Sequence, residues 1–320
     1  MGAAGNKIPK ENEKSLIKRK IMLTFKELNN GLKCPIIGLG TALIKDEKYI
    51  DVVYQSIIDG IKLIDTEPKN EEFVGLGIKK AINEGKVKRK DLFIVTKLEL
   101  EEKEDPESAL KKSLKRLQLD YVDLYLDHWP SCINLNEPEK YKLIPVKDTW
   151  EKMEKLVGQK LTKSIGVSNY NIQNLLNIIS ICRIKPVVNE VEFNPYLYQK
   201  DLQEFCDKEG IKIFAYYPMV KGRFCKEELI KEKDLDLLNE PKVKSLAEKY
   251  GKTPGQIVLN WHINEGVVPI PGTSKPGRMK ENLGAVEFKM EENDYQSLRS
   301  LSVKHYRFCT GFFIYGIDIF

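Results

Sequence analysis

One pattern recurs eight times along this chain and limits what the chain can fold into. Each time, a short aliphatic or β-branched run closes on one or two polar residues, and a segment of helical character usually follows. The clearest copy spans residues 122–128 and stops abruptly on Asp127-His128-Trp129-Pro130. The eight runs are residues 36–40, 63–65, 92–97, 122–128, 164–169, 187–192, 212–217 and 267–273. Apolar runs of this length are typical of buried parallel strands.

Eight strand-then-helix units in one chain of this size predict an α/β fold, a (β/α)8 TIM barrel. In such barrels the functional residues collect at the carboxyl ends of the strands. The polar residues that close the eight runs are therefore the first candidates for a functional site: Asp65, Lys97, His128, Ser168, Asn169, Glu190 and Tyr216.

The segments between the strands support one barrel domain. Apolar residues recur at helical spacing in the segments 49–58, 72–82, 106–117, 150–157, 172–179, 201–208, 243–250 and 255–263. Asn29-Asn30-Gly31 separates two short runs, and Asn-Gly is a strong turn signal, so a β-hairpin precedes the barrel. We predict a polar tail at 1–20, a barrel at 21–303 and a hydrophobic tail at 304–320.

Composition excludes several classes of function. The 52 basic residues are interleaved with 47 acidic ones, which indicates a solvated surface and no nucleic-acid partner. No apolar run is long enough to span a membrane, and no metal-ligand cluster stands out. The six cysteines include no Cys-x-x-Cys pair, so we expect reduced thiols and a cytoplasmic location.

A series of motifs, in order along the chain, resembles the aldo-keto reductase family from about residue 23 to residue 301. They are Gly38-Leu39-Gly40-Thr41, Ile64-Asp65-Thr66, Asn70-Glu71-Glu72, Thr96-Lys97, Leu124-Tyr125-Leu126 with His128-Trp129-Pro130, Gly166-Val167-Ser168-Asn169, Asn189-Glu190-Val191-Glu192 with Asn194-Pro195-Tyr196, Ala215-Tyr216, and Ile270-Pro271-Gly272-Thr273 with Arg278 and Glu281-Asn282. The resemblance implies a reductase that moves hydride from NADPH to a carbonyl carbon.

The resemblance also implies four catalytic side chains around the carbonyl oxygen: Asp, Tyr, Lys and His. Asp65, Lys97 and His128 match three of them. The family pattern Asp-Thr-Ala-x-x-Tyr is followed shortly by Asn-Glu, whereas this chain reads Asp65-Thr66-Glu67-Pro68-Lys69 and then Asn70-Glu71. The segment is about two residues shorter, and it contains no tyrosine.

Two interpretations follow from the missing tyrosine. In the first, which we adopt as the main prediction, the reductase chemistry is lost or nearly lost. The protein is then a non-catalytic subunit, scaffold or cofactor-responsive module. In the second, Lys69 or His128 serves as proton donor in an active NADPH-dependent aldehyde or ketone reductase, since the reference pKa of lysine, about 10.4, is close to that of tyrosine, about 10.

The resemblance further implies an NADP(H) site. Ser168, Asn169 and Glu190 take the places that bind the nicotinamide carboxamide, and Tyr216 takes that of the ring that stacks on the nicotinamide. The family has Gln where this chain has Glu190, and a Ser where it has the bulkier Tyr217. Basic and polar residues suited to a 2′-phosphate favour NADPH over NADH: Thr273, Ser274, Lys275, Arg278 and Asn282.

The chain end is the second unusual feature. Residues 311–320 are Gly-Phe-Phe-Ile-Tyr-Gly-Ile-Asp-Ile-Phe, an aromatic and aliphatic stretch with one acid. A stretch this hydrophobic is poorly suited to remain in water. It either covers the mouth of its own barrel or docks on a protein partner, and the sequence leaves both alternatives open.

Overall fold

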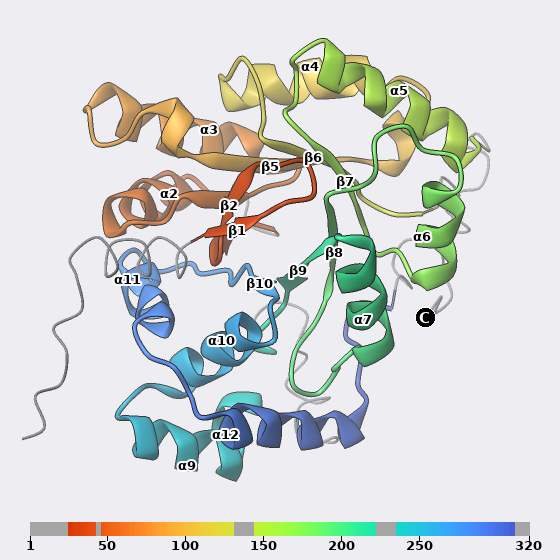
Figure 1. Ribbon diagram of the computed structural model, residues 1–320. Coiled ribbons are helices and arrows are strands. Elements are labelled where there is room, and N and C mark those ends of the chain that lie inside the picture. Colours follow the sequence, from red (N-terminus) through yellow and green to blue (C-terminus); the bar gives the residue numbers. More distant parts are fainter. Residues whose placement is uncertain (1–24, 43–45, 131–143, 222–234, 311–320) are drawn as a thin grey trace, which may run out of the picture.

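The computed structural model describes residues 25–42, 46–130, 144–221 and 235–310 (Figure 1). At its centre lies one sheet of eight parallel strands, and each strand pairs with its neighbour in the chain. They are β3 (Gly38–Gly40), β4 (Leu63–Asp65), β5 (Phe93–Leu98), β6 (Leu124–Asp127), β7 (Ile165–Ser168), β8 (Val188–Glu192), β9 (Lys212–Tyr216) and β10 (Val268–Pro269). All eight predicted strands are present, most of them shorter than the apolar runs.

The sheet closes into a barrel through two glycines. Gly40 at the end of β3 bridges Gly272, just beyond β10, and its N–H donates to the Pro271 carbonyl at 3.1 Å. A Cβ at Gly40 would lie 2.6 Å from the Ile270 carbonyl oxygen, so only glycine lets the first and last strands approach this closely. The predicted (β/α)8 fold is confirmed.

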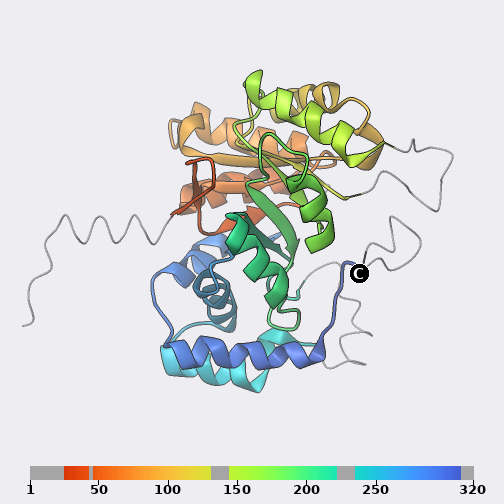
Figure 2. The same ribbon diagram turned by 45° about the vertical axis from the view of Figure 1, so that its right-hand side comes forward.

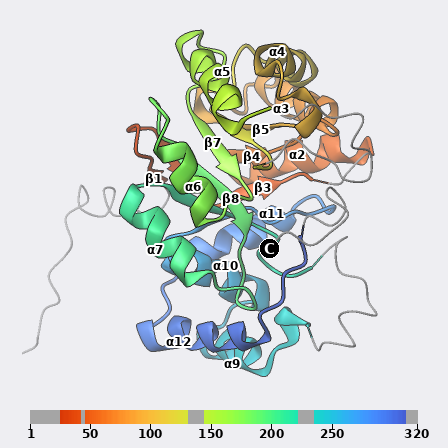
Figure 3. The ribbon, with the colours of Figure 1, turned by 90° about the vertical axis from the view of Figure 1, so that its right-hand side faces the viewer.

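Helices surround the barrel. Figure 3 shows α3, α4 and α5 on one side, with α6 and α7 next to them around the barrel. Their bounds are α2 (Lys48–Asp59), α3 (Glu71–Asn83), α4 (Pro106–Leu117), α5 (Val146–Gly158), α6 (Ile172–Ile179), α7 (Lys200–Glu209), α9 (Pro241–Tyr250), α10 (Pro254–Asn264), α11 (Arg278–Leu283) and α12 (Glu292–Ser297). Short 3-10 turns lie at Arg89–Asp91, Leu100–Glu102, Leu237–Asn239, Gly284–Val286 and Leu298–Lys304. None of the helices in the described part of the chain has the length and apolar character that crossing a membrane requires.

Local sequence explains several of these boundaries. The Asp105 carboxylate accepts from the Ser108 N–H at 3.0 Å and caps α4, whose first residue is a proline. Thr253 and Gln256 form a reciprocal capping box at the start of α10. The sequence analysis did not predict α12 or the 3-10 turn after it. Figures 1 and 2 show both lying along α9, and Lys249 of α9 pairs with Asp294 of α12 at 2.6 Å.

The predicted hairpin is formed by β1 (Phe25–Glu27) and β2 (Lys33–Pro35), which pair antiparallel. Its turn contains Gly31 with a φ of 81°, as the Asn-Asn-Gly sequence requires. Leu28 and Cys34 of the hairpin belong to the apolar cluster inside the barrel, with Leu63, Phe93, Val95, Leu124, Leu126, Val187, Val188, Phe214, Val268 and Ile270. A second, larger cluster lies between strands and helices. The hairpin thus closes the end of the barrel opposite to the carboxyl ends of the strands.

The packing of α3 on α4 depends on Gly75. A Cβ there would lie 2.6–2.7 Å from three backbone atoms of Leu117. We therefore expect Gly75→Ala to lower the free energy of unfolding by about 1–3 kcal/mol, because overpacking outweighs the helix propensity of alanine, worth about 1 kcal/mol. The control is Gly158→Ala in α5, which meets nothing within 4 Å and should be neutral or mildly stabilising. Urea denaturation measures both, and equal effects would contradict the packing argument.

Candidate active site

The alternation of side chains along the strands brings the predicted residues together. Leu63, Val95, Leu126, Val188 and Phe214 point into the barrel, as their membership of the inner cluster shows. The residue two positions further along each strand faces the same way. These residues are Asp65, Lys97, His128, Glu190 and Tyr216, and Ser168 on β7 joins them through its bond to the Glu190 carbonyl at 2.9 Å. All six therefore lie in one layer at the carboxyl end of the barrel.

Lys97 lies between two carboxylates in this layer. Its ammonium group contacts Asp65 closely and lies 3.2 Å from Oε1 of Glu190. It also donates to the Thr66 carbonyl at 3.2 Å. All three charged side chains are almost fully buried, with 3–5% of each exposed. The cluster thus carries two acids and one cation away from water.

This imbalance of charge shifts the protonation of the cluster. Burial and the Glu190 carboxylate raise the pKa of Asp65 to about 8, although Lys97 acts in the opposite direction. Burial disfavours the Lys97 cation, but Asp65 and Glu190 outweigh it and raise the Lys97 pKa above its ordinary value. The physical reason is that two buried carboxylates beside one cation leave an excess negative charge, which a bound proton removes.

His128 is paired with an acid that the sequence analysis did not single out. Its Nδ1 lies 3.1 Å from Oε1 of Glu99, a residue two positions beyond Lys97. Burial disfavours the imidazolium, but the Glu99 carboxylate outweighs burial and raises the pKa of His128. With Nδ1 bonded to Glu99, Nε2 is the ring nitrogen left to meet a substrate oxygen.

The shortened segment after β4 forms a tight turn. The Asn70 N–H donates to the Glu67 carbonyl at 3.1 Å, and Pro68 occupies the second turn position, where its fixed φ fits. The Asn70 side chain bonds Thr66 and Thr41 and accepts from the Glu67 N–H at 3.3 Å. Lys69 is exposed at the tip of this turn. Glu67, by contrast, is only 9% exposed as a whole residue.

Side chains suited to an amide lie beside this cluster. Asn169, in a left-handed conformation with a φ of 63°, donates to the Ser168 hydroxyl at 3.2 Å and accepts from the Tyr216 hydroxyl at 2.7 Å. Oε2 of Glu190 is buried and has no hydrogen-bond partner among the described residues. A buried acceptor without a partner is costly, so this oxygen fits a ligand N–H donor.

The remaining predicted cofactor residues lie at the rim after β10. Thr273 accepts a hydrogen bond from Tyr49 through its carbonyl at 2.8 Å. Ser274, Lys275 and Arg278 are exposed, and Arg278 pairs with Glu281 at 2.9 Å. Asn282 is buried against Met279 in α11. The structure thus brings the basic side chains to the surface at one rim and places Ser168, Asn169 and Glu190 deeper in the barrel.

The segment 305–310 packs on the barrel itself. The Glu192 carboxylate accepts from the N–H groups of Phe308 and Cys309, the latter at 2.7 Å. The Phe308 ring packs on Tyr217, with ring centroids 5.2 Å apart. Burial and the Glu192 charge raise the pKa of the Cys309 thiol to about 12, and this thiol lies against the Tyr216 hydroxyl. The predicted hydrophobic stretch 311–320 lies outside the described residues, so docking on a partner stays a prediction.

A fully buried ion pair supports the loop that follows β6. The Lys103 ammonium lies 2.7 Å from the Asp127 carboxylate and also donates to the Trp129 carbonyl. Asp127 accepts a second bond, from the Tyr170 hydroxyl, at 2.8 Å. Because Asp127 and Trp129 flank His128, this pair fixes the path of the backbone that presents the histidine.

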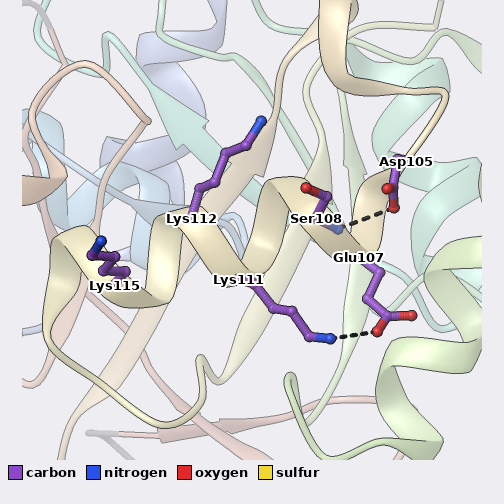
Figure 4. Close-up of a pocket in the computed structure, with 6 residues that line it drawn as sticks. All are labelled: Asp105, Glu107, Ser108, Lys111, Lys112 and Lys115. Carbon is purple, nitrogen blue, oxygen red and sulfur yellow. Dashed lines mark hydrogen bonds and ion pairs between the residues drawn. The ribbon is translucent and has the colours of Figure 1, made fainter.

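A hollow of about 610 Å³ lies away from these residues, on the outer face of α4 (Figure 4). Its lining is Asp105, Glu107, Ser108, Lys111, Lys112 and Lys115. The lysines on it are neutralised in part, since Lys111 pairs with Glu107 at 2.6 Å. The chemistry that the sequence predicts is therefore at the barrel end and not in this hollow.

Comparisons with known proteins agree with the arrangement of these residues. A model of the "Aldo/keto reductase family" matches residues 37–303. The chain is 37% identical to an NADH-dependent D-xylose reductase of Candida parapsilosis over 295 residues, 86% of this chain and 91% of that protein. It is also 37% identical to aldo-keto reductase family 1 member A1 of Gallus gallus, over 89% of this chain and 90% of that protein. The crystal structure of a Bombyx mori aldo-keto reductase in complex with NADP superposes with a TM-score of 0.81 at 32% identity, covering 91% of this chain and 97% of that one.

Proposed function

The chain belongs to the aldo/keto reductase family, and on this premise we propose that it is an NADPH-dependent reductase of aldehydes or ketones. The observation that carries the proposal is the buried cluster of Asp65, Lys97 and Glu190 beside the His128–Glu99 pair. A cation and an imidazole that converge on one end of a barrel suit a carbonyl oxygen that gains negative charge in the reaction.

The residues deeper in the site fit the nicotinamide end of the cofactor. The carboxamide of a nicotinamide offers an NH2 group, and the unpartnered Oε2 of Glu190 is an acceptor for it. Ser168 and Asn169 add a hydroxyl and an amide on the same side, and Tyr216 adds a ring. When bound, NADPH would supply the hydride for the carbonyl carbon. The protein's part is to place both reactants within reach of Lys97 and His128 and to exclude water.

Cofactor preference depends on the rim after β10. We expect NADPH to bind more tightly than NADH, because exposed Lys275 and Arg278 suit a 2′-phosphate. Arg278→Ala should weaken NADPH binding by about 1.5–3 kcal/mol, roughly 10- to 150-fold, and leave NADH binding nearly unchanged. Fluorescence titration measures both affinities. Lys280→Ala, an exposed lysine on the same helix, is the control; an equal loss for NADH and NADPH would contradict a 2′-phosphate contact.

Turnover tests the reductase itself. The full-length chain, with NADPH and benzaldehyde, should oxidise NADPH and release benzyl alcohol in equal amounts. A variant with both Lys97 and His128 replaced by Met should lose this activity while still binding NADPH. Binding of NADPH without any turnover in the natural chain would refute the reductase.

A second candidate is favoured by one observation, the absence of a tyrosine between Asp65 and Asn70. In that case the chain binds NADP(H) without reducing a carbonyl compound and serves as a cofactor-responsive subunit. The reductase is preferred because the charged side chains of the site are buried and paired with one another, an arrangement that costs folding energy to maintain.

A further inference from the structure

We propose that Glu99 makes His128 the proton donor of the site, in place of the tyrosine that is missing between Asp65 and Asn70. The inference rests on the proposed reductase function and names the two residues that complete it. In this proposal His128 is the catalytic residue, because its ring meets the substrate oxygen. Glu99 is a positioning residue, which acts through the imidazole.

The pairing of β5 with β6 places Glu99 beside His128. Lys97 lies opposite Leu126 in this parallel pair. Two positions further along each chain segment stand Glu99 and His128, which therefore share the inward face with Lys97 and Leu126. Oε1 of Glu99 lies 3.1 Å from Nδ1 of His128. The register of the sheet thus brings the carboxylate and the imidazole into direct contact.

The backbone of His128 is held from both sides. Its N–H donates to the Leu98 carbonyl at 3.2 Å, and its carbonyl accepts from the Asn169 side chain at 3.0 Å. With the backbone held and Nδ1 bonded to Glu99, the orientation of the ring is set. Nε2 makes no hydrogen bond with any residue that the structure describes. The imidazole therefore keeps one nitrogen for a ligand.

The charges around His128 favour an imidazolium. Burial and the Lys97 cation oppose it. The Glu99 carboxylate, with a smaller contribution from Glu67, outweighs both and raises the pKa of His128. Burial also disfavours the Glu99 carboxylate, but the His128 charge, with help from Lys69 and Lys97, outweighs burial and lowers the pKa of Glu99. Both shifts favour a carboxylate that faces a protonated ring, and a raised pKa keeps that ring protonated closer to neutral pH.

The charged residues of the neighbouring cluster have less access to a ligand. The Lys97 ammonium already bonds Asp65, Glu190 and the Thr66 carbonyl. Although burial opposes its charge, Asp65 and Glu190 raise the Lys97 pKa, which makes it a weaker acid. The side chains of Lys97 and Asp65 are each 5% exposed, whereas that of His128 is 17% exposed. The imidazole is thus the acid that a substrate can reach.

Two further donors are placed less well. The Tyr216 hydroxyl gives its proton to the Asn169 side chain at 2.7 Å, and burial raises the pKa of Tyr216 well above its ordinary value. Lys69 is exposed at the tip of the turn after β4. Of the two donors that the sequence left open, the structure favours His128.

The chemical step balances with His128 as the acid. The carbonyl carbon gains a hydride, with its two electrons, from NADPH, and the π pair of the C=O bond moves to oxygen. That oxygen takes the proton from Nε2 of His128, and the electrons of the N–H bond stay on the ring. The products are the alcohol, NADP⁺ and a neutral His128 that keeps its Nδ1–H on Glu99. The ring takes a proton from solvent before the next cycle.

The pH profile of kcat tests both roles. His128→Gln should lower kcat for benzaldehyde reduction about 10²- to 10⁴-fold. Because the donor is the protonated ring, kcat should fall as pH rises through the His128 pKa, and Glu99→Gln should move this fall to lower pH. At about pH 8 the Glu99→Gln loss should be about 10- to 10³-fold, the effect of an opposite charge on a neighbouring acid, and much smaller at about pH 6. Glu99→Asp keeps the charge and should keep the profile close to the natural one.

Two variants serve as controls for this profile. Glu101→Gln removes an exposed acid two positions beyond Glu99. Lys69→Met removes the exposed cation of the turn after β4. Both should retain the natural kcat and its pH dependence. A loss of activity in Lys69→Met, with activity kept in His128→Gln, would make Lys69 the acid and overturn the proposal.

NMR titration of the imidazole groups supplies a readout on the cofactor-free protein. The chain has three histidines, and the His128 signal is the one that disappears in His128→Gln. Its midpoint should lie above the ordinary histidine value of about 6.5 in the natural chain and should fall in Glu99→Gln. His262 is an internal reference: both its nitrogens contact backbone carbonyls, at 2.7 and 2.9 Å, and burial lowers its pKa to about 4. Its signal should be the same in both proteins.

The outcomes separate the donor role from the reductase function. A His128 midpoint at or below the ordinary value in the natural chain would overturn the proposal, as would a natural pH profile of kcat in Glu99→Gln. Activity that survives in His128→Gln would do the same while leaving the reductase in place. Absence of turnover in the natural chain would refute the reductase and the donor role together, and a raised midpoint would then support the ion pair alone.

Discussion

Replacing Lys103 by Met should lower the free energy of unfolding by about 3–5 kcal/mol, one of the largest losses expected from a single substitution in this chain. The Lys103 side chain is 2% exposed, and its ammonium group pairs with Asp127 at 2.7 Å and bonds the Trp129 carbonyl. Methionine has a similar volume, so packing changes little. The loss comes from an Asp127 carboxylate that stays buried and keeps, among the residues that the structure describes, the Tyr170 hydroxyl as its side-chain partner.

Urea denaturation provides the measurement, and two further variants separate charge from packing. Lys112→Met, on the exposed face of α4, should change stability by no more than about 0.5 kcal/mol. Adding Asp127→Leu to Lys103→Met should restore part of the stability, because the unpaired charge is then gone. A double variant less stable than Lys103→Met alone would show that shape, not charge, sets the loss.

Lys97→Met should be similarly destabilising, by about 3–5 kcal/mol at pH 8, but its loss should depend strongly on pH. Without the cation, nothing offsets burial and the Glu190 charge, so Asp65 holds its proton more tightly in the folded state, whereas the unfolded chain releases it. Since the folded state then binds more protons, its stability falls as pH rises. The natural chain should show a weaker form of the same trend. The pKa of Asp65 is raised to about 8 in the folded state, so the stability that its bound proton contributes should be lost as pH rises through that value.

Denaturation at several pH values between about 5 and 8 tests this linkage. The stability of Lys97→Met should approach that of the natural chain at the acid end and diverge from it at the alkaline end. Lys90→Met, an exposed lysine just before β5, serves as the control and should run parallel to the natural chain. A loss in Lys97→Met that is the same at every pH would contradict the excess of buried carboxylates.

The fold could be read from the sequence because its signals are local and repeated. Each strand is an apolar run that ends on a polar residue, and each main helix carries an apolar stripe. Elements without such a signal were not predicted. The helix α12 and the 3-10 turn Leu298–Lys304 are short and carry no continuous apolar stripe at helical spacing. Leu298 is nevertheless buried in the core, and Lys249 of α9 pairs with Asp294 of α12.

The sequence predicted the site residues that stand at strand ends. It did not predict those whose position depends on the turn after β4 or on the ion pair with His128. Asp65, Lys97 and His128 stand at strand ends, so their grouping follows from the barrel. Glu99 could have been noticed as the next inward position after Lys97. Glu67 carried one signal, an ionisable residue in place of the family's alanine, but only the turn made by Pro68 and Asn70 reveals that its side chain is buried.

The bond between Glu192 and the segment 305–310 has a consequence for how such a barrel can change its ligands. Glu192 holds the segment by the main-chain N–H groups of residues 308 and 309, which every amino acid except proline possesses. These two hydrogen bonds therefore do not depend on which side chains stand at 308 and 309, although the Phe308 ring adds its packing on Tyr217. Side chains at the rim can be exchanged while the chain keeps its course, so the protein can acquire a new ligand preference without rebuilding the strand that anchors it.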